Sequence, residues 1–144
     1  MSEEVYDFVV MDSKSRVTIP LKIRKILGLR EGMKLLLIAN SSKKELRIIP
    51  LLELQAKVYR LRIVMSDRPG VLARAASLLA EERVDLIMTE SRTIRRGETA
   101  EWVIVADLSN CQLDVSALVE RIKSLEFVKS VEITQMGYKP ERGM

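Results

Sequence analysis

At Met65-Ser66-Asp67-Arg68-Pro69-Gly70-Val71-Leu72-Ala73 an apolar strand gives way to a helix, and the second half of the chain can be built outward from this junction. Upstream, β-branched and apolar residues predict a strand over Val58–Met65. Downstream, apolar residues recur at helical spacing over Gly70–Glu82, which predicts a helix with one buried stripe. The expected members of that stripe are Val71, Leu72, Ala75, Leu78 and Leu79.

Further along the chain the same alternation of strands and helices continues. We expect strands at Val84–Ile94 and Ala100–Leu108 around the turn Arg95-Arg96-Gly97-Glu98, then a helix at Asp114–Leu125 and a strand at Val128–Gln135. The second helix is expected to bury Val115, Leu118, Val119 and Ile122. The order βαββαβ predicts two helices on one face of an antiparallel sheet, a ferredoxin-like α+β domain over residues 57–136. The polar residues 137–144 are expected to form a flexible tail.

A smaller module is predicted over residues 5–52. A strand is expected within Val9–Ile19, and Pro20 and Gly28 bracket a helix over Leu21–Leu27. Two short strands, Lys34–Ala39 and Glu45–Ile49, follow around a polar turn. The expected buried face of the helix consists of Ile23, Ile26 and Leu27. A module of about 50 residues buries little apolar surface by itself, so we expect it to oligomerise. Pro50 ends the last strand, and 51–57 is expected to be a stiff connection.

The composition narrows the possible functions. The chain has 144 residues, of which 47% are hydrophobic and 31% charged, as expected for a folded protein. It has no histidine and a single cysteine, Cys111, so Cys/His zinc sites and histidine-dependent catalytic triads are excluded. We therefore expect neither an enzyme nor a metal or other cofactor. No long apolar run and no secretory pattern are present, which predicts a cytoplasmic protein without a membrane partner.

The basic side chains are concentrated in the first module. The net charge is only +4, yet many lysines and arginines lie between Asp12 and Leu52 against few acids. They are Lys14, Arg16, Lys22, Arg24, Lys25, Arg30, Lys34, Lys43, Lys44 and Arg47. Arginine can form bidentate hydrogen bonds with phosphates or guanine edges, so this distribution is compatible with DNA binding. A solvated helix face is the alternative interpretation of the same charges.

One sequence pattern in the first module resembles the AbrB/SpoVT (MazE-like) swapped-hairpin family. It consists of Arg16-Val17-Thr18-Ile19-Pro20, a basic amphipathic turn, Leu27-Gly28-Leu29 and then Glu31-Gly32-Met33. The resemblance implies that two chains interleave their hairpins into one all-β barrel with a short helix, and that a basic surface grips double-stranded DNA. The DNA contacts it implies are Arg16, Arg24 and Lys25, with Lys14 and Lys22 at the edge.

The second module resembles the ACT domain. The resemblance is carried by the junction Asp67-Arg68-Pro69-Gly70 between strand and helix, and it extends over Val58–Gln135 with the same order of elements. It implies that an amino acid binds at a dimer interface, between this loop and the second strand of a partner chain.

Candidate ligand residues follow from the loop. The backbone N–H groups of Gly70, Val71 and Leu72 are expected to face a carboxylate at the helix N-terminus, and Arg68 belongs to the same loop. Asp67, and Asp85 on the second strand, could accept hydrogen bonds from a ligand ammonium group. Two alternatives remain open: Asp67 could cap the helix itself, and the domain could serve for dimerisation alone. We expect Trp102 to pack rather than to recognise a ligand.

These observations predict a prokaryotic transcriptional regulator. Its first module would bind DNA as a homodimer or higher homo-oligomer, and its second would act as an allosteric sensor of a small effector, an amino acid. An antitoxin-like DNA-binding protein is one alternative. A regulatory subunit of an amino-acid metabolic enzyme that does not bind DNA is the other.

Overall fold

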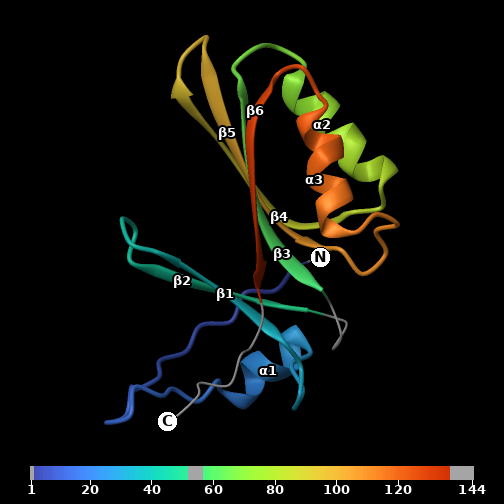
Figure 1. Cartoon of the computed structure of the whole chain (residues 1–144). Coiled ribbons are helices and arrows are strands. Elements are labelled where there is room, and N and C mark those ends of the chain that lie inside the picture. Colours follow the sequence, from blue (N-terminus) through green and yellow to red (C-terminus); the bar gives the residue numbers. More distant parts are fainter. Residues whose placement is uncertain (1, 52–56, 137–144) are drawn as a thin grey trace. The chain divides into compact units, whose positions relative to one another are not determined.

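The computed structural model describes residues 2–51 and 57–136. The chain divides into two compact units, Met1–Gln55 and Ala56–Met144 (Figure 1). The expected connection at 51–57 and the expected tail at 137–144 lie wholly or mostly outside the described residues. Among the described residues, no helix combines the length and the apolar character needed to cross a bilayer.

The N-terminal unit contains one helix and one hairpin. Helix α1 spans Leu21–Leu27 as predicted, between Pro20 and Gly28, and Gly28 takes the left-handed conformation (φ 67°) that ends helices. Strands β1 (Leu35–Asn40) and β2 (Glu45–Pro50) pair antiparallel, each within a residue of its predicted bounds. A polar turn joins them.

The strand predicted within Val9–Ile19 is absent from this chain. The segment instead folds back at a turn in which the Asp12 N–H donates to the Arg16 carbonyl (3.0 Å) and the Ser15 N–H to the Asp12 carbonyl (3.1 Å). A strand needs a neighbouring backbone to complete its ladder, and no described segment of the same chain supplies one here. The alternation along Arg16–Ile19 is therefore a strand pattern without a strand partner. No closed barrel forms from the single chain.

The buried helix face predicted in this unit is also wrong for the single chain. None of the α1 residues is buried; Ile26 and Leu27 are 37% and 47% exposed, and Ile23 is partly covered. The N-terminal segment is more open still, with Phe8 98% and Val10 88% exposed. The unit is too small to supply a second layer over this apolar surface, which is the physical reason for the discrepancy.

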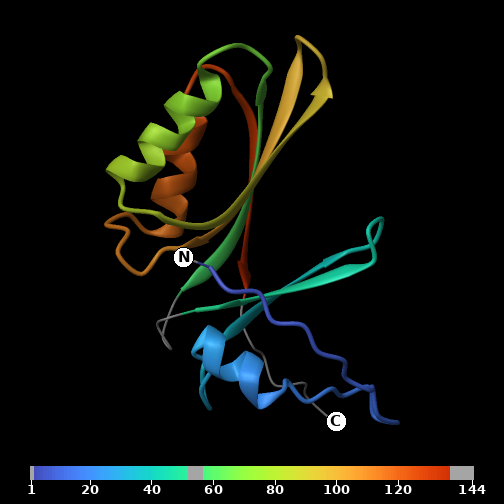
Figure 2. The ribbon, with the colours of Figure 1, turned by 180° about the vertical axis from the view of Figure 1, so that it is seen from behind.

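The C-terminal unit has the predicted βαββαβ order. Its elements are β3 (Val58–Ser66), α2 (Val71–Glu81), β4 (Asp85–Arg95), β5 (Thr99–Asp107), α3 (Val115–Lys123) and β6 (Val128–Met136). All neighbouring strands are antiparallel, in the order β4-β5-β3-β6. Figures 1 and 2 show both helices on one face of this sheet. The predicted ferredoxin-like arrangement is confirmed.

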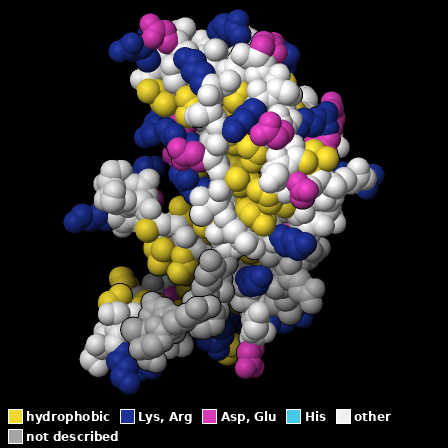
Figure 3. Space-filling model, viewed as in Figure 1, with side chains coloured by type: hydrophobic (Ala, Val, Ile, Leu, Met, Phe, Trp, Pro, Cys, Tyr) yellow, Lys and Arg dark blue, Asp and Glu magenta, His cyan; other side chains and the backbone are white. Residues whose placement is uncertain are grey.

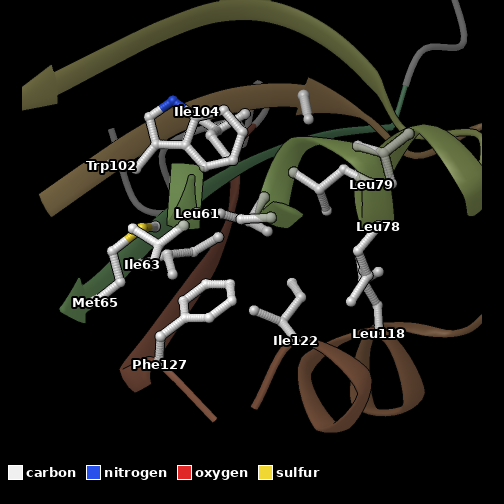
Figure 4. Close-up of a cluster of buried hydrophobic side chains, with 14 of the residues drawn as sticks. Leu61, Ile63, Met65, Leu78, Leu79, Trp102, Ile104, Leu118, Ile122 and Phe127 are labelled. Carbon is white, nitrogen blue, oxygen red and sulfur yellow. The ribbon is translucent and has the colours of Figure 1, made fainter. Parts of the chain in front are cut away.

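The core of this unit lies between the helices and the sheet (Figure 4). Leu61, Ile63 and Met65 alternate along β3 and are at most 1% exposed, since every second side chain of a strand faces the same layer. Helix α2 buries Val71, Ala75, Leu78 and Leu79, but Leu72 is 40% exposed, contrary to the prediction. Helix α3 buries Leu118 and Ile122, whereas Val115 and Val119 are only half-buried.

Candidate functional site

A small cavity lies beside the junction from which the fold was predicted. Its volume is about 180 Å³, below the range of drug-sized ligand pockets and suited to a compact metabolite. Its walls come from the end of β3, the β3–α2 loop, the first turn of α2, the middle of β4 and the start of β5. The lining residues are Met65, Asp67, Arg68, Val71, Leu72, Ser91, Arg92, Thr93, Ala100, Glu101 and Trp102.

The β3–α2 loop is held in place by the turn between β4 and β5. The Gly97 N–H donates to the Asp67 carboxylate (2.7 Å), and the Asp67 N–H donates to the Glu98 carbonyl (3.2 Å). Asp67 therefore does not cap α2, and the capping alternative is wrong. Its carboxylate joins two loops at one rim of the cavity, and fixes the loop geometry there.

Helix α2 begins without a side-chain cap. Its N-cap residue is Gly70 in the left-handed region (φ 88°), which a side chain would strain. The Val71 N–H reaches back to the Arg68 carbonyl at 3.4 Å, so this predicted ligand donor is already partly used. The Leu72 N–H has no acceptor among the described residues, and Leu72 is one of the residues that line the cavity. Gly70 shapes this entry but does not itself line the cavity.

Trp102 belongs both to the core and to the cavity. It is 5% exposed and packs in the main apolar cluster, which confirms the packing prediction. It also lines the cavity, and strand pairing places Ser91 directly opposite it and Thr93 opposite Ala100. Sequence reasoning missed every lining residue outside the loop and the first turn of α2, namely Met65, Ser91, Arg92, Thr93, Ala100, Glu101 and Trp102. Only the β4–β5 register, which includes irregularities on either side of this point, brings them to the loop.

Asp85 does not reach this cavity within one chain. It is the first residue of β4 and pairs with Asp107, whereas the cavity lies six positions further along the strand at Ser91. That separation is about 20 Å in extended backbone. The role predicted for Asp85 at a partner's loop stays a prediction.

An ion network lies on the sheet face opposite the helices. The Glu101 side chain is 8% exposed and accepts from Arg62 Nε (2.9 Å) and Nη2 (2.7 Å) and from Arg92 Nη2 (3.1 Å). Arg62 Nη1 also lies 3.6 Å from Glu132 Oε1. The network thus crosses from β4 through β5 and β3 to β6. Charge-assisted contacts satisfy Glu101, which would otherwise be costly to bury.

The cations predicted to contact DNA are all in the N-terminal unit, and three of the five already have partners in the chain. Arg16 Nε donates to Asp12 Oδ2 (2.8 Å), Lys22 lies 3.6 Å from Asp7, and Arg24 donates to the Ile19 carbonyl. Lys14 and Lys25 are exposed, with no side-chain hydrogen bond or ion pair among the described residues. Arg16 nonetheless remains 69% exposed.

Backbone and side-chain hydrogen bonds from Arg16 hold the pKa of Asp12 below its usual value. They do so because they favour the charged carboxylate. On the face seen in Figure 3, acidic side chains likewise stand among the basic ones.

Residues 59–127 match the family model of the ACT domain. The match includes every residue that lines the cavity, and it ends one residue before β6 begins. It begins at residue 59, so it carries no information about the N-terminal unit. A search of the curated proteins gave no match.

Several solved structures resemble the ACT part of the chain. One is the ACT domain from a GTP pyrophosphokinase of Chlorobium tepidum, with 11% identity and a TM-score of 0.46, covering 56% of this chain and 100% of that one. Another is a homoserine dehydrogenase from Thiobacillus denitrificans, with 23% identity and a TM-score of 0.43, covering 55% of this chain and 17% of that one.

Proposed function

We propose that the chain is a DNA-binding transcriptional regulator, not an enzyme, in which the ACT domain senses an amino acid. The observation that carries this proposal is the cavity at the β3–α2 loop of a domain that matches the ACT family. A ligand-sensing regulatory role is what such a domain suggests. The finer parts of the proposal, namely the amino acid and the DNA, rest on the chemistry described below.

The polar groups around the cavity suit a zwitterion. The Leu72 N–H and the positive end of the α2 dipole favour a carboxylate, and the exposed Arg68 lies on the same rim. The Asp67 carboxylate, already fixed by Gly97, can accept from a ligand ammonium group. In a dimer, Asp85 of the second chain would complete the site. The domain would then both bind the ligand and join two chains.

The DNA-binding half is supported by the N-terminal unit. Its sequence resembles the swapped-hairpin family, and its extended segment before Pro20 and the apolar face of α1 lack a covering layer in one chain. A second copy that supplied this layer would bring two sets of basic side chains together, which doubles the phosphates neutralised. The proposed contacts are Lys14, Arg16, Lys22, Arg24 and Lys25. Arg16 would exchange its Asp12 contact for a phosphate.

Fluorescence anisotropy on duplex DNA from the chain's own promoter tests the DNA-binding half. The proposal predicts tight binding whose logarithm falls linearly with the logarithm of salt concentration. The double variant Arg16→Ala/Arg24→Ala should bind at least about tenfold more weakly, with a smaller salt slope. As a control of equal charge, Lys57→Ala/Lys123→Ala in the other unit should bind like the wild type. Binding that is absent at low salt, or equal in both double variants, would contradict the proposal.

A further inference from the structure

Trp102 carries a hydrogen-bond donor that the protein does not use. None of the described residues accepts a hydrogen bond from its indole N–H, although Trp102 is only 5% exposed. Among the described residues, every side-chain nitrogen or oxygen of a residue that is not exposed has either a hydrogen-bond partner or contact with solvent. The indole N–H therefore reaches solvent. Figure 4 shows the nitrogen on the edge of the ring that is turned away from Ile63, Met65 and Phe127.

Trp102 borders one solvent-filled opening, the cavity at the β3–α2 loop. Trp102 lines it together with Ser91 and Thr93, whose side chains also make no hydrogen bond among the described residues. Cβ atoms of directly paired residues lie about 5 Å apart, so Ser91 and Trp102 form one wall of the cavity. The first turn of α2 also lines the cavity through Leu72, whose N–H has no acceptor among the described residues.

We infer that Trp102 is the specificity-determining residue of the cavity: its indole N–H binds an oxygen acceptor on the ligand side chain, and its ring limits that side chain's size. The inference rests on the proposed binding of an amino acid. The α2 N-terminus takes the carboxylate, which leaves the Trp102, Ser91 and Thr93 donors facing the remainder of the ligand. A compact side chain that ends in a hydroxyl, amide or carboxylate oxygen satisfies them.

An apolar side chain of the same size is disfavoured at this wall. It would displace water from the indole N–H and the hydroxyls without replacing the hydrogen bonds, and sites built to bond a polar group reject isosteres that lack it. Large aromatic side chains are also disfavoured, because the cavity that Trp102 lines has a volume of only about 180 Å³. The expected order is therefore serine over alanine, threonine over valine, and asparagine or aspartate over leucine.

Isothermal titration calorimetry of the full chain with each of the twenty amino acids, these pairs included, tests the inference. In the wild type, the polar member of the tightest-binding pair should bind at least about tenfold more tightly than its apolar isostere. Trp102→Phe keeps most of the ring but removes the N–H, so the polar ligand should lose about tenfold in affinity while its isostere changes little. The ratio of the two dissociation constants should approach one.

A second variant separates ligand recognition from packing. Ile104→Val lies in the same core and is fully buried, but it does not line the cavity. It should lower the thermal midpoint and leave the ratio unchanged. Trp102 is the only tryptophan, so its fluorescence should also change when the polar ligand is added to the wild type.

The possible failures can be told apart. If the wild type binds none of the twenty amino acids, the proposed function is wrong. If it binds one with a favourable polar ratio that survives in folded Trp102→Phe, or if it prefers the apolar isostere, the role assigned to Trp102 is wrong while ligand sensing stands.

Discussion

Glu101 is the side chain whose environment is most demanding. It is nearly buried on the open face of the ACT sheet and is bonded by Arg62 and Arg92 from the neighbouring strands. Glu101→Gln removes the charge and replaces one of the two acceptor oxygens with an NH₂ donor, so Arg62 and Arg92 can no longer both be bonded by it, and the remaining ion pair of Arg62 is the 3.6 Å contact to Glu132. Breaking such a network costs about 1 to 3 kcal/mol, so urea denaturation should show a midpoint lowered accordingly. The exposed pair Arg74–Glu126 supplies the control: Glu126→Gln should leave the midpoint almost unchanged.

Asp12, an exposed residue, gives a pH dependence. Its folded-state pKa lies below the ordinary value of an aspartate, chiefly because the backbone and side chain of Arg16 donate to it. A carboxyl group with a lowered pKa contributes stability above its unfolded pKa and loses that contribution as pH falls through the folded value. The Lys14 and Arg16 amide resonances, whose N–H groups donate to Asp12, should therefore shift together below pH 3.8. In Asp12→Asn this transition should vanish; its persistence would contradict the assignment.

At the scale of elements, the two helices of the ACT domain begin in different ways. Helix α3 is capped by Asp114, whose carboxylate accepts from the Ala117 N–H at 2.8 Å. Asp114→Ala should destabilise the chain by about 1 kcal/mol in urea denaturation, because that N–H is left unpaired. Asp85→Ala, an exposed aspartate that caps no helix, should change stability by less than about 0.5 kcal/mol. Equal effects in the two variants would show that the cap contributes nothing.

Helix α2 relies instead on the backbone of Gly70. A Cβ at this position would meet no atom within 4 Å, so the expected penalty of Gly70→Ala is purely conformational, about 1 to 2 kcal/mol at φ 88°. Asparagine tolerates the left-handed region better than alanine, so the stability of Gly70→Asn should lie between those of the wild type and Gly70→Ala. A Gly70→Ala variant as stable as the wild type would mean that the loop relaxes without cost.

How much the sequence could predict differs between elements. Every element of the ACT domain was predictable within one or two residues, since its apolar periodicity matches the core that the single chain builds. Val9–Ile19 has an equally clear pattern but forms no strand, because ladder partners are a property of the assembly and not of the segment. The cavity was predictable only on its loop side. Ser91 and Trp102 face it through a β4–β5 register that no local pattern encodes.

At the scale of the whole molecule, the apolar surface of the N-terminal unit predicts self-association. We expect sedimentation to show a dimer or larger species, and Phe8→Ser/Val10→Ser to shift it toward smaller species, because both side chains are more than 85% exposed in one chain. Ile94→Ser, at an exposed apolar position of the ACT domain, is the comparison. If only Ile94→Ser dissociates the assembly, the ACT domain and not the N-terminal unit holds it.

In a ligand-sensing regulator, ligand occupancy of the ACT domain must change DNA affinity. This requires that two arrangements of the assembly bind the ligand unequally. The most direct test is the anisotropy titration on promoter DNA at one fixed salt concentration, with and without the amino acid that calorimetry identifies. A coupling of about 1 to 3 kcal/mol corresponds to a change of roughly 5- to 150-fold in the DNA dissociation constant. We predict a change within this range. A dissociation constant that is the same with the cavity empty and saturated would contradict the central claim.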